Sequence, residues 1–443
     1  MQLPLKPWSR LPGAVVLLAL LVSACAPAST PAPTAAPTTA PKPAATSAPA
    51  ATSGAAAVAT SGTAAAVSGG TTGQPTQVPG GTAVQGAPTS AGGAATAAAK
   101  PAAGGTPAAA AAGPVTPGPV ATKPATNPTD KMKLIFGGAV TPPNMVHLAP
   151  YIAKDQGFFD EVGLDVEIKS FEGGVGALRG GISGGLDVVA TSSDPMFAAI
   201  QQGAPIKAIG TYAPKLSTMI MARPDVKTIQ DLKGRKLGIQ EVGGFSDVMF
   251  KLALQKENIS VNDVQFVTIT TANRVPAMVS GQVDAVVLHI DQYYTALSAD
   301  PNFNVVAKMW EVAPNWWYAA FVATEDVIAG KREALNRFMT AVIKAQRFMY
   351  TNAAETKRVA VDETKAKPDV VEKAYADLFA ASVWSVNDGM PKDLIDNTIE
   401  REVAVGTIKV EPKLTSDQIV EKSIVEEAIK RNGGPWTGDP RWY

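Results

Sequence analysis

The chain has 443 residues, in which 39 Lys and Arg residues balance 39 Asp and Glu residues, and it contains one Cys and two His. This balance argues against a protein held to nucleic acid or anionic lipid by bulk electrostatics, because such proteins carry an excess of Lys and Arg on the binding face. With one Cys the chain can form no internal disulfide, so the fold has to rest on an apolar core.

The first 24 residues predict a signal peptide. Lys6 and Arg10 supply the positive charge, and residues 11–22 form an apolar stretch that is too short to span a bilayer. Small residues come directly before Cys25, in a pattern that resembles the bacterial lipobox, where this cysteine is acylated. The resemblance implies a lipid that holds the protein at the extracytoplasmic face of the cell membrane. The alternative is an ordinary secretory signal followed by a chance cysteine.

Residues 25–130 are dominated by Ala, Pro, Thr, Gly and Ser, with almost no large apolar side chain. Such a segment has too little apolar surface to offset the entropy of ordering. We therefore expect a disordered linker between the lipid anchor and a folded domain. A cell-wall or glycosylated stalk would be physically similar.

From residue 131 onward, apolar runs of strand length alternate with helical patterns, which predicts an α/β domain with mainly parallel sheets. Strands are expected at 133–136, 163–168, 186–190, 206–209 and 218–222, with helices at 149–159 and 194–202 between them. Further strands are expected at 236–240, 264–269, 283–289, 305–308 and 317–323. The remainder is mainly helical, at 333–350, 369–381, 392–405 and 416–430.

This order predicts a domain at 131–443 with two lobes. Lobe one would comprise about 131–223 and 324–443, and lobe two, about 224–323, would be inserted between them. Two strands near 219–224 and 318–323 would cross the waist and form a hinge. A ligand is expected in the cleft, where carboxyl ends of strands meet helix N-termini. The alternative is a single doubly wound enzyme domain.

Four segments, at 149–166, 187–193, 229–239 and 280–285, resemble ABC-importer solute-binding proteins of the nitrate, sulfonate and thiamine-precursor branch. The first contains Ala-Pro-Tyr-Ile-Ala-Lys-Asp-Gln-Gly-Phe-Phe, which resembles the opening helix of that family. The resemblance implies a two-lobed type II periplasmic-binding-protein fold, with a permease and an ATPase as separate partner chains. It also implies a binding protein and not an enzyme, and we expect a monomer without metal or cofactor.

Loops that should face the cleft supply the candidate ligand-binding residues Asn144, His147, Thr191, Ser192, Ser193, Tyr212, Gly243, Gly244, Ser246, His289, Asp291 and Tyr293. Hydroxyls and free backbone N–H groups at helix N-termini can meet a ligand, although Ser193, Asp194 and Ser246 could instead cap helices. Gly243 and Gly244 would let the backbone approach the ligand, or form a simple tight turn.

Aromatic residues concentrate after residue 293, and Trp316 and Trp317 complete the candidate site. One of them could stack on a flat heterocycle while the other packs in the core, and core packing is the alternative for each. His147 resembles a histidine that precedes the same helix in thiamine-pyrimidine-binding members. Its imidazole could both donate to and accept from a heterocycle edge, with an ordinary loop histidine as the alternative.

An anionic ligand would favour Arg or Lys in these loops, which contain neither. The nearest basic residues, Arg179 and Arg274, are expected on solvated helix faces. The sequence therefore favours a neutral or weakly charged flat ligand, with riboflavin as the first expectation. A thiamine pyrimidine precursor, a sulfonate, nitrate or a small amide are the alternatives.

Two other functional classes are weighed against transport. Pyrimidine-synthase enzymes share the implied fold but depend on a Cys-rich motif, whereas the one Cys here lies in the lipobox. Two His and no further Cys also leave few ligands for a metal or nucleophilic site. A ligand-sensing domain would need an output segment, and the sequence predicts none.

Overall fold

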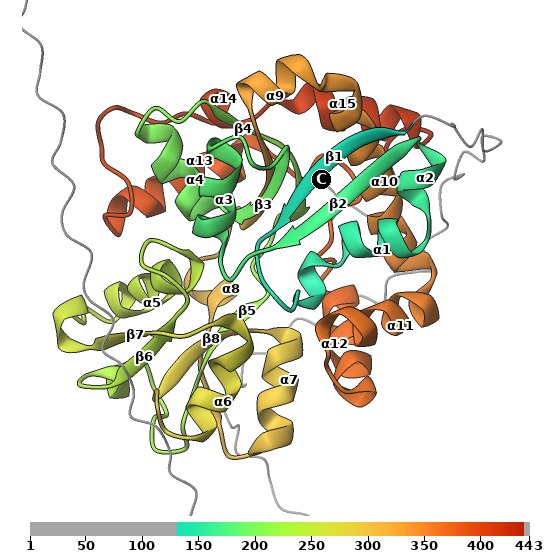
Figure 1. Cartoon of the computed structure of the whole chain (residues 1–443). Coiled ribbons are helices and arrows are strands. Elements are labelled where there is room, and N and C mark those ends of the chain that lie inside the picture. Colours follow the sequence, from blue (N-terminus) through green and yellow to red (C-terminus); the bar gives the residue numbers. More distant parts are fainter. Residues whose placement is uncertain (1–130, 438–443) are drawn as a thin grey trace, which may run out of the picture. The chain divides into compact units, whose positions relative to one another are not determined.

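The computed structural model describes residues 131–437, which form two α/β lobes (Figure 1). The predicted signal peptide at 1–24, the lipidation of Cys25 and the linker at 25–130 lie outside the described residues. None of the helices within 131–437 is long and apolar enough to cross a membrane.

Lobe one is built on a five-stranded sheet with the order β2, β1, β3, β10, β4. Its strands are β1 (Met132–Gly138), β2 (Leu164–Ser170), β3 (Val188–Ser192), β4 (Ile206–Ala213) and β10 (Ala319–Thr324). β1 pairs in parallel with β2 and β3, whereas β10 runs antiparallel between β3 and β4. Every residue of β3 is buried, as expected for a central strand with both faces covered.

Lobe two is built on a second five-stranded sheet with the order β7, β6, β8, β5, β9. Its strands are β5 (Thr218–Ala222), β6 (Lys236–Ile239), β7 (Gln265–Thr268), β8 (Ala285–His289) and β9 (Asn304–Lys308). β5 runs antiparallel to β8 and β9, while β6 pairs in parallel with β7 and β8. Each sheet therefore contains one antiparallel strand, β10 or β5, which follows an interlobe connection, and the prediction of mainly parallel sheets is confirmed for the other strands.

The boundaries between the lobes differ from the predicted ones by a few residues. β5 belongs to lobe two because it pairs with β8 and β9, and β10 belongs to lobe one because it pairs with β3 and β4. The chain therefore crosses between the lobes at 214–217 and again between β9 and β10, not within strands at 219–224 and 318–323. The two separate sheets also exclude the single doubly wound domain.

Helices cover both sheets. Lobe one contains α1 (Ala149–Asp155), α2 (Phe158–Glu161), α3 (Gly174–Ile182), α4 (Ser193–Gln201), α9 (Glu325–Gly330), α10 (Arg332–Thr351), α11 (Ala353–Thr364), α12 (Pro368–Ala380), α13 (Lys392–Ala404), α14 (Ser416–Ile419), α15 (Lys422–Arg431) and the 3-10 turn η1 (Met145–His147). Lobe two contains α5 (Phe245–Lys256), α6 (Arg274–Val279), α7 (Ile290–Ala299), α8 (Met309–Val312) and the 3-10 turns η2 (Gln230–Leu232), η3 (Val261–Asp263) and η4 (Thr271–Asn273).

The core of lobe one lies between its sheet and α10. The rings of Phe136 in β1, Phe321 in β10 and Phe338 in α10 lie 5.5 to 6.0 Å apart, and all three are at most 1% exposed. Such aromatic contacts add to the apolar burial that holds a helix against a sheet. The sheet and the helices on it thus form a rigid base for the loops at its edge.

Two predicted helices are each divided in the structure. Gly157 has φ 71° and divides the predicted helix at 149–159 into α1 and α2. The predicted helix at 416–430 breaks between α14 and α15, where the backbone N–H of Glu421 donates to the carbonyl of Ala208 in β4 at 2.8 Å. Pairing with the sheet edge replaces the helical hydrogen bonds there.

Candidate ligand-binding cleft between the lobes

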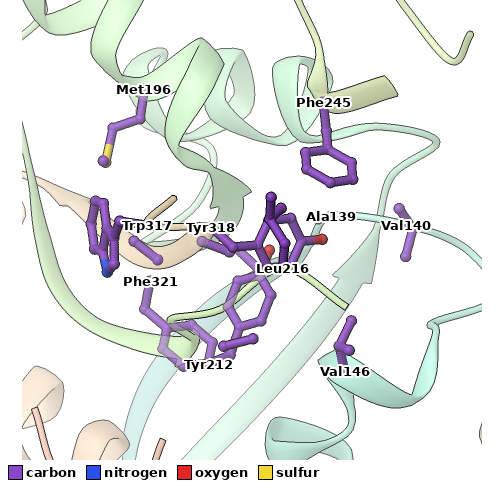
Figure 2. Close-up of a cluster of buried hydrophobic side chains, with 14 of the residues drawn as sticks. Ala139, Val140, Val146, Met196, Tyr212, Leu216, Phe245, Trp317, Tyr318 and Phe321 are labelled. Carbon is purple, nitrogen blue, oxygen red and sulfur yellow. The ribbon is translucent and has the colours of Figure 1, made fainter. Parts of the chain in front are cut away.

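Residues from both lobes meet around a small hollow at the cleft. Lobe one and its connection contribute Ala139, Val140, His147, Gly174, Val175, Ser192, Pro195, Tyr212 and Tyr318, and lobe two contributes Gln240, Glu241, Gly244, Phe245, Arg274 and His289. Figure 2 shows Phe245 on one side of Ala139 and Tyr318, with Tyr212 below them. The free volume is about 20 Å³, which is close to the space that one water molecule needs.

The lobes are in direct contact around this hollow. The Asn144 side-chain amide donates to Asp291 Oδ2 at 3.3 Å, and the backbone N–H of Val175 donates to Glu241 Oε1 at 2.8 Å. The Gln240 amide donates to the carbonyl of Glu172 at 2.9 Å. These hydrogen bonds join lobe one to lobe two, so the structure has the cleft closed.

Both histidines of the chain face the cleft, His147 from η1 and His289 from the end of β8. Their ring centroids are 5.7 Å apart, and the Tyr318 hydroxyl lies 3.3 Å from His289 Nε2. Burial, with a smaller effect of the Arg274 charge, lowers the pKa of His147 to about 3. Burial also lowers the pKa of His289 well below its usual value. Both imidazoles are therefore neutral, and each can offer one donor and one acceptor.

Arg274 brings a buried positive charge to the cleft. It is the first residue of α6, directly after the turn η4, and is 1% exposed. Its Nη1 donates to Gln292 Oε1 at 3.3 Å, while Nε has no hydrogen-bond partner among residues 131–437. Burial lowers the pKa of Arg274 to about 10, which still leaves the guanidinium charged at neutral pH.

This position corrects the sequence-based expectation for Arg274. A solvated helix face was expected, but η4 continues from the cleft end of β7 and turns the first residue of α6 inward. The expected lack of cations in the cleft is therefore wrong. Arg179, on α3, is exposed as expected. The loop after β7 was not among the loops predicted to face the cleft, although the carboxyl ends of strands generally face such a cleft.

Several of the predicted residues do come together here. His147, Ser192, Tyr212, Gly244 and His289 line the hollow, and Asn144 and Asp291 form one of the bridges beside it. Burial raises the pKa of Asp291 to about 6. The Thr191 hydroxyl donates to the carbonyl of Gly174, which lines the hollow, at 3.3 Å. Ser246 supports the loop, since its hydroxyl accepts from the backbone N–H of Gln240 at 3.0 Å.

Gly243 and the predicted helix caps have backbone roles. Gly243 has φ 74°, and its N–H donates to Asp247 Oδ2 at 2.8 Å, so it forms the tight turn before α5. The residues that precede α4 and α5 are Ser192 and Gly244, and neither makes a side-chain capping bond. Ser193, Asp194 and Ser246 therefore lie inside the first turns and are not caps.

The remaining predicted residues do not line the hollow. Trp317 is 0% exposed, stacks on Phe197 at 6.1 Å and lies toward Met196 in Figure 2, away from Phe245. Trp316 lines a separate hollow of about 680 Å³ beside α12. Tyr293 packs against Tyr294, with ring centroids 4.8 Å apart, and Ser193 is fully buried in lobe one. Packing in the core was the alternative interpretation of Trp316 and Trp317 in the sequence.

The chain resembles a known family and several named binding proteins. Residues 144–356 match the family model described as NMT1/THI5 like. Over 206 residues, this chain is 27% identical to a putative binding protein of Brucella abortus (strain 2308). The alignment covers 46% of this chain and 64% of that protein. The chain is 26% identical over 230 residues to the putative binding protein YtlA of Bacillus subtilis (strain 168), covering 50% and 69%.

Solved structures share the fold of this chain. A protein of Bordetella bronchiseptica RB50 superimposes with a TM-score of 0.62 at 20% identity, covering 69% of this chain and 99% of that one. The alkanesulfonate-binding protein SsuA from Xanthomonas axonopodis pv. citri, bound to MOPS, gives a TM-score of 0.56 at 18% identity, covering 66% and 98%. The nitrate-binding protein NrtA from Synechocystis PCC 6803 gives 0.56 at 14%, covering 68% and 89%. The predicted periplasmic-binding-protein fold is confirmed.

Proposed function

We propose that this protein is the extracytoplasmic substrate-binding component of an ABC importer and binds a small molecule that carries an anionic group. The buried guanidinium of Arg274 carries the proposal, because its unpartnered Nε belongs to a residue that lines the hollow between the lobes. A buried charge without full pairing is costly, and an anionic ligand would supply the missing hydrogen bond and charge.

The fold and the relatives support the transport part of this proposal. The named binding proteins share the sequence or the fold, and two lobes that close on each other suit capture and release of a solute. Among residues 131–437 no group of three or more His, Cys, Asp or Glu side chains is placed to hold a metal ion. Permease and ATPase chains would be the partners, with a lipid on Cys25 holding the protein at the outer face of the membrane.

A flat single-ring heterocycle, such as a thiamine pyrimidine precursor, is the second candidate. His147, His289 and Phe245 favour it, because Phe245 lies nearly parallel to His289, at 16° and 6.0 Å between ring centroids, and both imidazoles are neutral. Riboflavin, the first expectation from sequence, has less support. Trp316 and Trp317, which were expected to stack on its rings, lie outside the hollow.

Calorimetric titration of the full-length protein with methanesulfonate, nitrate, the thiamine pyrimidine precursor and riboflavin tests the proposal. We expect saturable binding of an anion and an affinity loss of roughly 10- to 100-fold in Arg274→Gln, because a hydrogen bond to a charged group contributes about 1.5–3 kcal/mol. Arg179→Gln, on an exposed face, is the control and should bind as wild type.

The outcomes separate the candidates. An anion affinity that is the same in Arg274→Gln and wild type would contradict the role of Arg274. Binding of the pyrimidine alone, unaffected by Arg274→Gln, would favour the second candidate. Binding of riboflavin at micromolar concentration would support riboflavin as the ligand, as first expected from the sequence.

A further inference from the structure

The start of α3 in lobe one carries backbone N–H groups that its own side chains leave uncapped. Its first turn and the residue before it read Gly173, Gly174, Val175 and Gly176, and no side chain of these residues makes a capping hydrogen bond. The first N–H groups of a helix need an acceptor from outside the helix, and they favour a negatively charged one. In this structure the acceptor comes from lobe two.

Glu241 of lobe two supplies this acceptor. It lies in the turn between β6 and α5, and its Oε1 accepts the backbone N–H of Val175 at 2.8 Å. Burial raises the pKa of Glu241, and the N–H groups of Val175 and Gly176 oppose this rise by stabilising the charged carboxylate. A carboxylate therefore lies where a helix N-terminus binds an anion.

Glycines from both lobes make room for the Glu241 side chain. A Cβ atom at Gly173 would overlap Glu241 Oε1, and a Cβ atom at Gly244 would lie 2.8 Å from Glu241 Cγ. Next to this side chain, the Gln240 amide donates to the carbonyl of Glu172 at 2.9 Å. The turn of lobe two is therefore in direct contact with the start of α3, and the carboxylate has one defined place on it.

The start of α3 also belongs to the cleft. Gly174, Val175 and Glu241 line the hollow between the lobes. Arg274 lines the same hollow, is 1% exposed, and its Nε has no hydrogen-bond partner among residues 131–437. An anionic group in the place of the Glu241 carboxylate would accept the N–H groups of α3 in the hollow that this guanidinium lines. Two negative groups would repel each other there, so one has to leave before the other binds.

We propose that Glu241 is an intramolecular competitor of the ligand: its carboxylate occupies the subsite at the N-terminus of α3 that the anionic group of the ligand takes by displacing it. This inference rests on the proposed function, because only an anionic ligand would compete for these N–H groups. The ligand binds the fraction of molecules in which Glu241 has left α3. The competition therefore lowers the apparent affinity for the ligand.

Calorimetric titration of the full-length protein with methanesulfonate tests the competition. Glu241→Ala should lower the Kd roughly tenfold relative to wild type, because the competing carboxylate is removed. Glu311→Ala removes an exposed carboxyl of α8 in lobe two and should bind as wild type. A contact that only closed the lobes would have the opposite effect, so an equal or higher Kd in Glu241→Ala would overturn the proposal.

Nitrogen-15 NMR spectra recorded during the same titration test the position of the anion. The N–H resonances of Val175 and Gly176 should shift as methanesulfonate saturates the wild type, and the same shifts should occur at lower concentration in Glu241→Ala. Saturable binding without these shifts would overturn the subsite and leave the anion proposal standing. Absence of binding to both proteins would overturn the two together. If Glu241→Ala does not fold, the wild-type shifts still decide whether the anion binds at α3.

Discussion

Trp317 shows how an aromatic residue next to the cleft can serve the core instead of the ligand. Its backbone N–H donates to Thr398 Oγ1 at 2.7 Å, its indole N–H donates to the carbonyl of Gly389 at 2.9 Å, and its ring stacks on Phe197. These contacts join the start of β10 to α4 and α13. At the scale of the single residue, the Trp317 side chain therefore fixes the start of β10, and with it the position of Tyr318 in the cleft.

Replacing Trp317 with Ala should lower the free energy of unfolding by about 3–5 kcal/mol, because a large buried side chain and its hydrogen bond are lost. Urea unfolding followed by circular dichroism measures this change. Trp310→Ala is the matched control, since Trp310 is 37% exposed, and should cost less than about 1 kcal/mol. A change below about 1 kcal/mol in Trp317→Ala would show that the residue does not hold the core.

At the scale of elements, the close approach of α10 to β4 depends on Gly210. A Cβ atom at this position would lie 2.3 Å from Met339 Cε and 3.1 Å from Met339 Sδ. Gly210→Val should therefore overpack the interface between sheet and helix and lower the free energy of unfolding by about 1–3 kcal/mol. Thermal unfolding is the measurement. Met339→Val in the same chain shortens the opposing side chain, and failure of the double variant to recover stability would contradict the assigned contact.

At the scale of the whole molecule, closure depends on a few hydrogen bonds between the lobes, and Gly173 allows one of them. A Cβ atom there would lie 2.1 Å from Glu241 Oε1, which accepts the backbone N–H of Val175. Gly173→Ala should displace Glu241, weaken closure by about 1 kcal/mol and increase the radius of gyration in small-angle scattering. Gly176→Ala is the control, because its Cβ meets only Phe171 at 3.8 Å. Identical scattering from Gly173→Ala and wild type would contradict this role.

Local patterns predicted most of the elements, because alternation and helical periodicity depend on neighbouring residues. The helix predicted at 333–350 corresponds to α10, and the strand predicted at 218–222 corresponds to β5. Membership of a lobe depends instead on pairing between distant strands, so β5 and β10 were assigned to the wrong lobes. In the cleft, loop positions pointed to His147 and His289, whereas Arg274 was missed because its helix was assumed to be solvated.

The position of β10 between β3 and β4 has a consequence for the order in which the chain acquires structure. The strands of lobe two occupy one continuous stretch, from Thr218 to Lys308. Lobe one cannot complete its sheet until residues 319–324 have paired with β3 and β4, and these residues lie more than a hundred positions after β4 in the sequence. Because such distant pairing slows folding, we expect lobe two to gain protection from hydrogen exchange first during refolding. Lobe one, which contains the first strand of the domain, should thus complete its sheet after lobe two has folded.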